Sequence, residues 1–299
     1  MADYVWFITG ASSGFGKSIA LEALRRGHKV IASARSASKL GELKEAGAIV
    51  MDLDVTSDDE TLASKLAEAN SAYGKITHVV NAAGYILEGA VEETSNKEIF
   101  DIYNTNVFGS FKIARAATKY LRAAAASASN GRNTVLANFG SLGSWLSTSG
   151  VVAYCSSKFA VTGLTEGLAD ELKPFGIDVC IIEPGYTRTG FLIRGDENGS
   201  DHRMTTARTL SVYDGTPVAA LRDALNVYNG NQPGDVDRCA VVIVDVLTKQ
   251  GVAEGKEVPF RLVTGSDALA VVRNKCESTL KLVGEWEEVT SSVMFPQSE

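Results

Sequence analysis

Tyr154 and Lys158 stand four residues apart in a stretch whose pattern predicts a helix, so both side chains lie on one helix face. An ammonium group beside a phenol favours the phenolate by charge, and it can bring a tyrosine pKa of about 10 toward neutrality. Such a pair could move a proton at a carbonyl or alcohol oxygen. An isolated pair of this kind is more often an aromatic core residue and a solvated lysine, so the interpretation depends on what accompanies it.

A glycine cluster near the start of the chain is the first accompanying feature. Gly10, Gly14 and Gly16 lie between a predicted strand, 4–9, and a predicted helix, 17–26. Glycines let the backbone turn tightly and approach a pyrophosphate, while the helix N-terminus offers free N–H groups and a positive dipole. The pattern indicates a dinucleotide phosphate site, and a turn that binds nothing is the alternative for the cluster by itself.

Composition and charge argue against several other classes of protein. Among 299 residues, 29 Lys and Arg stand against 36 Asp and Glu, a formal charge of −7, so no nucleic-acid partner is expected. The four cysteines are widely spaced, which argues against a zinc site or a disulfide framework, and no metal is expected. Apolar runs are too short to span a bilayer, and a first strand at Tyr4 leaves no room for a signal peptide. We expect a cytoplasmic protein with no membrane partner.

Short apolar runs rich in β-branched residues alternate with helical stretches along the chain. This alternation predicts an α/β, doubly wound fold with about seven mainly parallel strands and helices on both faces, in a single domain over 1–299. Residues 241–247 could form a strand, but a helix start at 233–235 and a stop at Gly251 favour a helix, and 123–132 should fray from a helix into a loop. The predicted strands are 4–9, 29–33, 48–55, 76–82, 134–139, 177–183 and 258–263.

Arg35 follows the second predicted strand, where the adenine ribose of a dinucleotide would lie. An acidic residue at this place binds the ribose 2′-hydroxyl, whereas a guanidinium suits a 2′-phosphate. Arg35 therefore favours NADP (NADPH) over NAD, and Ser12 and Lys39 could assist. A solvated surface arginine is the alternative.

Further motifs follow in order, and together they resemble those of the short-chain dehydrogenase/reductases, in the branch with a single Rossmann-type domain. The resemblance covers nearly the whole chain, and the ordered set is highly specific. The motifs are T-G-A-S-S-G-F-G at Thr9–Gly16, L-D-V at Leu53–Val55, N-A-A-G at Asn81–Gly84, Asn106, Ser141, Y-C-S-S-K at Tyr154–Lys158 and P-G-Y-T-R-T at Pro184–Thr189.

The resemblance implies catalytic roles for four residues. Tyr154 would be the general acid/base, and Lys158 would bond the nicotinamide ribose and lower the tyrosine pKa. Ser141 would hydrogen-bond the substrate oxygen, and Asn106 would hold a water that links Lys158 to solvent. Reduction of a ketone builds negative charge on oxygen, so one donor that gives its proton and another that stabilises also fit the chemistry.

The resemblance also implies how a dinucleotide is held. Asp54 would contact the adenine ring, Asn81 with Gly84 would line the cofactor at a strand end, and Thr187 with Thr189 would bind the nicotinamide carboxamide. A helix cap at Asp54 and a strand-end turn at Asn81 are the alternatives. The predicted cofactor-binding set is Gly10, Ser12, Ser13, Gly14, Phe15, Gly16, Arg35, Asp54, Asn81, Gly84, Tyr154, Lys158, Pro184, Gly185, Thr187 and Thr189.

One motif departs from the family pattern. In N-F-G-S-L-G-S, Gly140 stands where a serine is usual, while Ser141 keeps the spacing. Ser144 is the competing candidate, disfavoured because it lies only ten residues before Tyr154. Cys155 is interpreted as a small packing residue, since no motif places a histidine to activate it.

The candidates for lining a substrate site are mostly apolar, which suggests a medium-sized hydrophobic carbonyl compound. Residues 191–234 are longer than a connection needs to be, so we predict a substrate-loop insertion at about 190–234 that closes as a lid. The alternative is extra helix, as at 218–228, that only covers the sheet or builds an oligomer contact. The lining candidates, several of which could equally be core residues, are Tyr85, Ile86, Leu142, Trp145, Tyr186 and 191–193.

These features predict an NADPH-dependent reductase of ketones or aldehydes, reversible to alcohol oxidation, whose partner is a small carbonyl or alcohol substrate. The alternatives are an NAD-dependent alcohol dehydrogenase, which Arg35 disfavours, and a non-redox protein of the same fold that binds a ligand or partner. Relatives in the family are often dimers or tetramers through two central helices, here 97–121 and 153–173, so a homodimer or homotetramer is expected.

Overall fold

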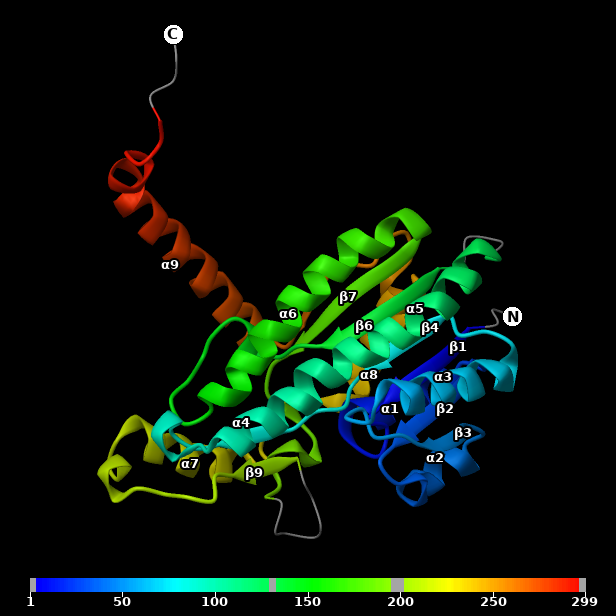
Figure 1. Ribbon diagram of the computed structural model, residues 1–299, viewed down its shortest axis with the longest axis horizontal. Helices are drawn as coiled ribbons and strands as arrows, with labels where there is room; N and C mark the ends of the chain where they lie inside the picture. The colour runs from blue at the N-terminus through cyan, green and yellow to red at the C-terminus, as the bar shows by residue number, and fades with distance from the viewer. Residues whose placement is uncertain (1–3, 129–132, 195–201, 296–299) are drawn as a thin grey trace.

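Seven parallel strands form one sheet at the centre of the molecule (Figure 1). The structure is a computed structural model that describes residues 4–128, 133–194 and 202–295. Its sheet has the order β11-β7-β6-β4-β1-β2-β3, so the predicted doubly wound, Rossmann-type fold is confirmed. The strands are β1 (Val5–Thr9), β2 (Lys29–Ala34), β3 (Ile49–Asp52), β4 (His78–Asn81), β6 (Thr134–Phe139), β7 (Ile177–Pro184) and β11 (Arg261–Thr264).

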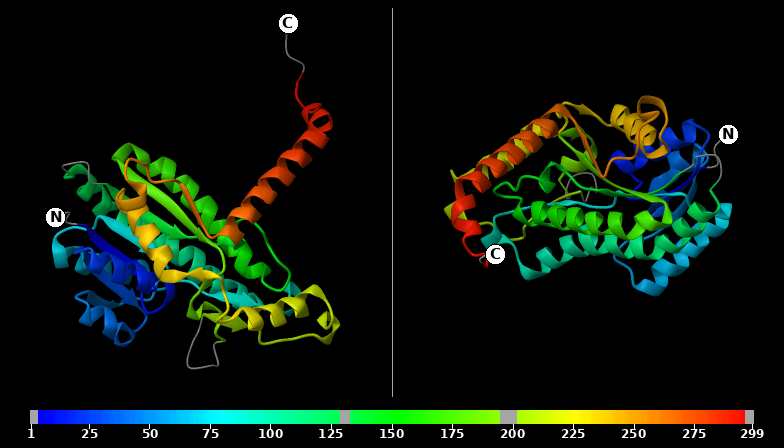
Figure 2. Two further views of the ribbon diagram at one scale, coloured as in Figure 1. Left: turned by 180° about the vertical axis from the view of Figure 1, so that it is seen from behind. Right: turned by 90° about the horizontal axis from the view of Figure 1, so that it is seen from above.

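Helices cover both faces of the sheet. Strand β1 is therefore apolar throughout, because its side chains are buried on both faces. Trp6 and Ile8 pack into the core on one face, whereas Val5 and Phe7 pack into the core on the other, because successive side chains of a strand point to opposite faces. Figure 1 shows α5 and α6 across one face, and Figure 2 shows α8 across the face behind. The first core includes side chains of α1 (Gly14–Arg25), α2 (Gly41–Glu45) and α8 (Val236–Thr248), and the second those of α3 (Asp59–Tyr73), α5 (Ser110–Ala126) and α6 (Val152–Leu172).

Shorter elements assemble beyond the carboxyl ends of the strands. Strand β5 pairs with β9, and β8 pairs with β10, so the chain around 190–234 is tied to segments far away in sequence. Helix α4 runs into α5 through a π-helical turn, Asn104–Gly109. These elements are β5 (Ile86–Glu88), α4 (Asn96–Tyr103), β8 (Thr187–Arg188), β9 (Arg203–Thr205), α7 (Pro217–Tyr228) and β10 (Gly234–Asp235).

Most predicted elements lie where the sequence placed them. The ambiguous run 241–247 is helical, within α8. The predicted strand 48–55 is shorter than expected, since β3 ends at Asp52 and the chain then turns. The run 123–132 continues α5 to Ala126, and its last four residues lie outside the described residues.

Helix α9 (Ser266–Ser291) has no counterpart among the predicted elements. It follows the edge strand β11 and extends away from the rest of the molecule in both views (Figures 1 and 2). Its first turn is anchored, because Ala268 is buried, but Leu280, Val283 and Trp286 are exposed. Within the part of the chain that the structure covers, no helix has the length and apolarity to span a bilayer.

Two buried histidines give the fold a pH dependence. His28 Nδ1 accepts a hydrogen bond from Trp6 Nε1 at 3.1 Å, and His78 lies in the sheet within hydrogen-bond distance of the Leu247 carbonyl, at 2.9 Å. Burial lowers the pKa of His28 to about 4 and that of His78 to about 3, because the charged imidazolium would lose its hydration.

We predict that acid destabilises the protein from pH 6.5 downward. The unfolded chain protonates its histidines near pH 6.5 while the folded protein does not, so stability is present above that pH and is lost as pH falls toward 4. At pH 5 the loss is about 2 kcal/mol for each imidazole. Denaturant titrations of wild type and of His28→Gln at pH 7 and pH 5 measure it, and the variant should lose about 2 kcal/mol less than wild type. An identical loss in both proteins would contradict the assignment.

Candidate active site

Tyr154 and Lys158 project from the first turns of α6, and both are buried. Lys158 Nζ donates a hydrogen bond to the carbonyl oxygen of Phe139, at the end of β6, at 2.8 Å. The same nitrogen lies 5.9 Å from the centre of the Tyr154 ring. The four-residue spacing therefore brings an ammonium beside a phenol under the end of the sheet.

The pKa shifts of this pair correct one expectation from the sequence. Burial raises the pKa of the Tyr154 phenol, and a hydrogen bond with the Ser141 side chain offsets only part of that effect. Burial also lowers the pKa of Lys158 to about 8. Desolvation thus outweighs the ammonium at this distance, and the protein's own charges do not bring the phenol toward neutrality. A phenolate near neutral pH would therefore need another positive charge nearby, such as that of an oxidised nicotinamide ring.

Ser141 and Ser144 have different surroundings, and these favour Ser141 as the hydroxyl that acts on substrate. The Ser141 hydroxyl is within hydrogen-bonding reach of Tyr154, and its Oγ also accepts the Gly143 N–H at 3.0 Å. The buried Ser144 Oγ instead donates to the carbonyl of Lys158 at 3.2 Å. Ser144 therefore fixes the loop against α6, while Ser141 faces the phenol.

Two glycines around Ser141 are tightly packed. A Cβ on Gly140 would lie 2.9 Å from atoms of Glu183, Ile181 and Ser144, which explains why this chain has glycine where the family pattern has serine. A Cβ on Gly143 would lie 3.2 Å from the sulfur of Cys155 and 3.4 Å from the Tyr154 ring. Gly143 was not among the residues predicted from the sequence. The only feature of the sequence that could have indicated it is its position two residues after the candidate catalytic Ser141.

Cys155 is a packing residue in the structure, as interpreted from the sequence. Its side chain is buried, and burial raises the pKa of the thiol, which disfavours the nucleophilic thiolate. Among the described residues, no group of three or more His, Cys, Asp or Glu side chains is placed to hold a metal ion.

Asn106 occupies the π-helical turn between α4 and α5, an irregularity that is frequent at functional sites. Its Oδ1 accepts the Tyr85 N–H at 3.1 Å, and its Nδ2 donates to the Tyr85 carbonyl at 3.0 Å and to Ser157 Oγ at 3.0 Å. A Cβ on Gly84 would lie 3.0 Å from Asn106 Oδ1 and 3.7 Å from Lys158 Nζ. The side chain thus holds the loop after β4 next to Lys158, and its role in binding a water stays a prediction.

The glycine turn between β1 and α1 has the close contacts that its sequence predicts. Gly10 has a φ of 64°, and a Cβ there would lie 2.7 Å from the backbone nitrogen of Ala83. A Cβ on Gly16 would lie 2.5 Å from the Gly10 carbonyl oxygen. Ser13 precedes α1, but its side chain does not cap the helix and lies 2.9 Å from His202 Nε2. The first N–H groups of α1 therefore keep a site for an anion.

The remaining N-terminal candidates lie at the ends of neighbouring strands. Arg35 is exposed directly after β2. Asp54 accepts two hydrogen bonds from Thr56, at 2.9 and 2.7 Å, in a turn, and Asp58, not Asp54, caps the next helix. Asn81 is buried and donates to Asn138 Oδ1 at 2.8 Å, which joins β4 to β6. Phe15 packs on Phe139, with ring centres 5.1 Å apart.

The motif 184–189 brings the end of β7 over the glycine turn. Thr189 Oγ1 accepts the N–H of Phe191 at 3.2 Å, and its side chain would lie 3.5 Å from a Cβ on Gly14. Thr187 Oγ1 donates to the Gly185 carbonyl at 3.2 Å. Asp267, at the start of α9, accepts the Tyr186 N–H at 2.7 Å, and a Cβ on Gly185 would overlap its carboxylate. Sequence reasoning missed Asp267, because its partner is 81 residues away.

A cavity of about 120 Å³ lies against Ser141 and Tyr154. Its walls are mostly apolar, as predicted, and five of the expected residues line it: Ile86, Leu142, Tyr186, Phe191 and Leu192. Trp145 does not: its Nε1 donates to the buried Glu183 at 2.9 Å, and its ring packs on Arg261. Tyr85 and Ile193 also lie outside the lining, which further includes Leu146, Thr148, Val151, Leu221 and Leu225.

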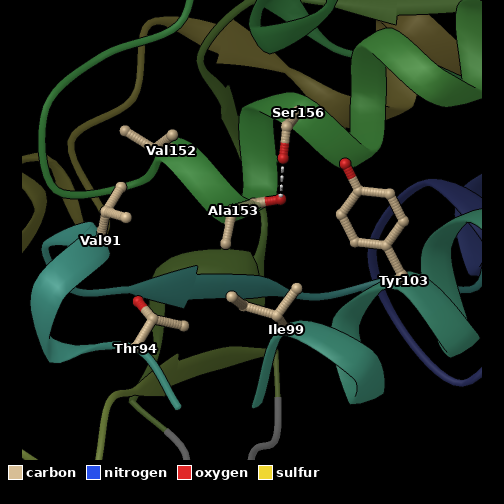
Figure 3. Close-up of a pocket in the computed structure, with 7 residues that line it drawn as sticks. All are labelled: Val91, Thr94, Ile99, Tyr103, Val152, Ala153 and Ser156. Atoms are coloured by element: carbon tan, nitrogen blue, oxygen red, sulfur yellow. Dashed lines mark hydrogen bonds between the residues drawn. The ribbon is translucent and has the colours of Figure 1, made fainter. Parts of the chain in front are cut away.

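A second cavity, of about 250 Å³, is larger but lacks the reacting groups (Figure 3). Val91, Thr94 and Ile99 face Val152 and Ala153 across it, and Ser156 Oγ donates to the Ala153 carbonyl at 3.0 Å. Neither Ser141 nor Lys158 lines this cavity. The smaller cavity is therefore the candidate active site, because Ser141 and Tyr154 line it.

Comparison with known proteins identifies the family. The model for the short chain dehydrogenase family matches residues 4–198. This protein belongs to the short-chain dehydrogenase/reductase family. Oxidoreductase BOA17 of Botryotinia fuckeliana is 30% identical over 96% of the chain and 97% of its own length, and oxidoreductase calM of Penicillium decumbens is 31% identical over 94% and 90%. This short-chain dehydrogenase/reductase is therefore an oxidoreductase.

Solved structures of short-chain dehydrogenases share the fold. A short-chain dehydrogenase from Streptomyces avermitilis has a TM-score of 0.84, with 33% identity over 98% of this chain and all of the other. A short-chain dehydrogenase/reductase from Burkholderia phymatum, solved in complex with NAD, has a TM-score of 0.73 over 99% and 98% of the two chains at 23% identity, which shows the fold alone.

The residues present fit a nicotinamide dinucleotide. The glycine turn leaves a cradle that a Cβ at Gly10 or Gly16 would fill, and the uncapped end of α1 lies beside it. Such a cofactor supplies or accepts a hydride when bound. In the roles predicted from the sequence, Tyr154 would supply the proton and Ser141 would stabilise charge on the substrate oxygen.

We predict that Tyr154→Phe reduces turnover at least about 100-fold, because positioned acid catalysis is usually worth 10²–10⁴-fold. Dinucleotide affinity should stay close to wild type, since the hydroxyl acts on substrate and not on the phosphates. Steady-state kinetics and a cofactor-binding titration measure the two effects. Tyr103→Phe, which removes a phenol hydroxyl in the second cavity, is the matched control and should leave turnover unchanged. More than a tenth of wild-type turnover in Tyr154→Phe would refute the role.

Proposed function

We propose that this protein is an NADPH-dependent reductase that transfers hydride to the carbonyl of a medium-sized, mostly apolar ketone or aldehyde, with alcohol oxidation as the reverse reaction. The observation that carries the proposal is the pair Ser141 and Tyr154 at an apolar cavity, with the Lys158 ammonium 5.9 Å from the centre of the Tyr154 ring. In this mechanism Ser141 and Tyr154 both bond the carbonyl oxygen, and Tyr154 gives its proton as negative charge develops there. Apolar walls exclude water from the reacting carbon.

The size of the cavity limits how the substrate enters. About 150 Å³ of apolar space holds one benzene ring, so a cavity of about 120 Å³ takes only the reacting end of a medium-sized molecule. The rest of the substrate must lie outside this cavity, or segment 190–234, which supplies part of its wall, must move. Leu192, Leu221 and Leu225, all from 190–234, line the cavity, which supports the proposed substrate-binding role of that insertion.

The lid motion of 191–234 remains a prediction, and the described part of the segment is firmly attached. Arg203 Nε donates to the buried carboxylate of Glu88 at 2.8 Å, and Arg222 pairs with the buried Glu93. Breaking either pair would leave a buried charge without its partner, which costs several kcal/mol. We therefore propose that any opening pivots about β9 and α7. Residues 195–201 of the predicted insertion lie outside the described residues.

NADPH is proposed over NADH because of charge at the end of β2. Arg35 and Lys39 are both exposed there, and Arg35 acts electrostatically on Tyr85 and on His202, so its charge lies near the same edge of the site. The second candidate is an NAD-linked dehydrogenase, since the Burkholderia phymatum relative was solved with NAD. A non-redox role is disfavoured by the joint presence of Asn106, Ser141, Tyr154 and Lys158.

We further propose a homodimer or homotetramer, formed through α4–α5 and α6, and a cytoplasmic location. Phe100, Phe108 and Phe111 on the first helical stretch and Phe159 on α6 are exposed, and burying them against a second copy would be favourable. Sedimentation equilibrium distinguishes these oligomers from a monomer, and cell fractionation tests the location.

A carbonyl screen tests the proposed function directly. We predict that wild-type protein oxidises NADPH in the presence of at least one apolar ketone or aldehyde from a panel graded by size, measured by the loss of NADPH absorbance. Tyr154→Phe should abolish that signal on the same compound. An alcohol panel with NAD and NADP tests the reverse reaction. Binding of dinucleotide with no turnover in either direction would favour the non-redox alternative.

We predict that Arg35→Asp lowers the NADPH/NADH ratio of kcat/KM by roughly 10- to 100-fold, because one charge-assisted contact to a 2′-phosphate is lost and a repulsive charge is added. Lys44→Asp makes the same change of charge on the exposed surface of α2 and is the control. Kinetics with both cofactors measure the ratio. An unchanged ratio in Arg35→Asp would mean that Arg35 is a surface residue, and the NADPH proposal would lose its main support.

A further inference from the structure

His202 connects three parts of the molecule that are far apart in sequence. Its backbone carbonyl accepts the N–H of Ile86 at 2.8 Å, which fixes it beside β5. Its ring stacks on Phe191, with centres 6.5 Å apart and planes 27° apart. Its Nε2 lies 2.9 Å from Oγ of Ser13 in the glycine turn. One side chain from the substrate segment thus contacts both a residue that lines the candidate active site and the predicted phosphate cradle.

Two positive charges act on His202. Burial lowers the pKa of its imidazole most, and Arg35, at the end of β2, and Lys39, in the turn that follows it, also oppose protonation. Its chain neighbour Arg203 is paired with Glu88, so that cation is neutralised. Ser13 and Phe191, which contact the ring, carry no charge.

This arrangement is suited to binding a phosphate. It consists of the cations Arg35 and Lys39, His202, and Ser13, whose side chain leaves the N-terminus of α1 uncapped. The N-terminus of α1 adds free N–H groups and a positive dipole to the same place. A phosphate group brought among these residues would reverse the electrostatics at His202, because the imidazolium would then face an anion and could donate a charge-assisted hydrogen bond.

We propose that His202 is a phosphate-binding residue for the dinucleotide, and that it fastens the substrate segment onto the glycine turn when the cofactor is bound. The inference rests on the proposed NADPH function and deepens it, because the 2′-phosphate lies on the side of Arg35 and the pyrophosphate on the side of α1. Binding of cofactor thereby holds Phe191 against the active-site cavity before substrate enters. His202 is a binding and positioning residue and takes no part in the proton transfer at Tyr154.

Titrations of the full-length protein with NADPH and with NADH, followed by fluorescence without substrate, test the proposal. The variants are His202→Gln, which can keep a hydrogen bond to Ser13 but cannot become charged, and Ser13→Ala, which removes that bond and keeps the imidazole. At pH 6 His202→Gln should bind NADPH about tenfold more weakly than wild type, the loss of one charge-assisted hydrogen bond. At pH 8, where the imidazole is neutral, the two proteins should bind alike. Ser13→Ala should keep the pH dependence of wild type.

Comparison of the cofactors tells which phosphate is bound. A loss confined to NADPH assigns His202 to the 2′-phosphate, and an equal loss for both assigns it to the pyrophosphate; either outcome supports the proposal. Hydrogen exchange over 202–213 gives a readout independent of affinity: NADPH should slow exchange in wild type and have less effect in His202→Gln. Thermal unfolding of both variants checks that the fold is intact.

Equal NADPH affinity and equal pH dependence in wild type and His202→Gln would overturn the proposal, and so would a loss that is the same at pH 6 and pH 8, since that indicates a structural role. Preference of the wild type for NADH would refute the NADPH proposal alone, because the pH comparison can then be made with NADH. Failure of the wild type to bind either dinucleotide would refute both.

Discussion

The buried ammonium of Lys158 is the constraint on which the site depends. A cation removed from water must be given partners, and here the Phe139 carbonyl at the end of β6 accepts its hydrogen bond. Because that carbonyl fixes Nζ, α6 is held at one height against the sheet, and Tyr154 one turn earlier is fixed with it. Gly84 and Asn106 lie on the other side, where a Cβ on Gly84 would be only 3.0 Å from Asn106 Oδ1. The same burial keeps the pKa of Lys158 low. The ammonium is therefore held in one position but deprotonates more readily than that of a solvated lysine.

A second polar arrangement positions the substrate segment. Glu88 and Glu93 are buried, and each is paired with an arginine from beyond residue 200. A buried carboxylate without its partner is costly, so these pairs select one register for β9 and α7 over many alternatives. None of these four side chains lines the cavity, but Leu192, Leu221 and Leu225 of the same segment do. The ion pairs therefore position the segment that supplies apolar side chains to the cavity.

Helix α9 contributes to the same site although most of it extends away from the sheet. Asp267 in its first turn accepts the Tyr186 N–H and occupies the space that a side chain at Gly185 would need. The loop 184–189 is thus held from both ends, by β7 and by a residue 81 positions away from Tyr186. The predicted nicotinamide side of the site is in this way linked to a part of the chain that carries none of the motifs.

The sequence by itself determined the sheet, the glycine turn and the grouping of Ser141, Tyr154 and Lys158, because these depend on local rules. Strand and helix periodicity, glycine spacing and the four-residue helix repeat all act within a short stretch of chain. Tertiary structure alone decided which apolar residues line the cavity: Trp145 was expected there, but it turns to the buried Glu183, which lies 38 residues away. The contacts of His202 and Asp267 were likewise beyond prediction, since their partners lie 189 and 81 residues distant. The pKa of Tyr154 also depends on both local sequence and fold. The four-residue spacing supplies the neighbouring ammonium, but burial, which is a property of the whole fold, has the larger effect and raises the pKa.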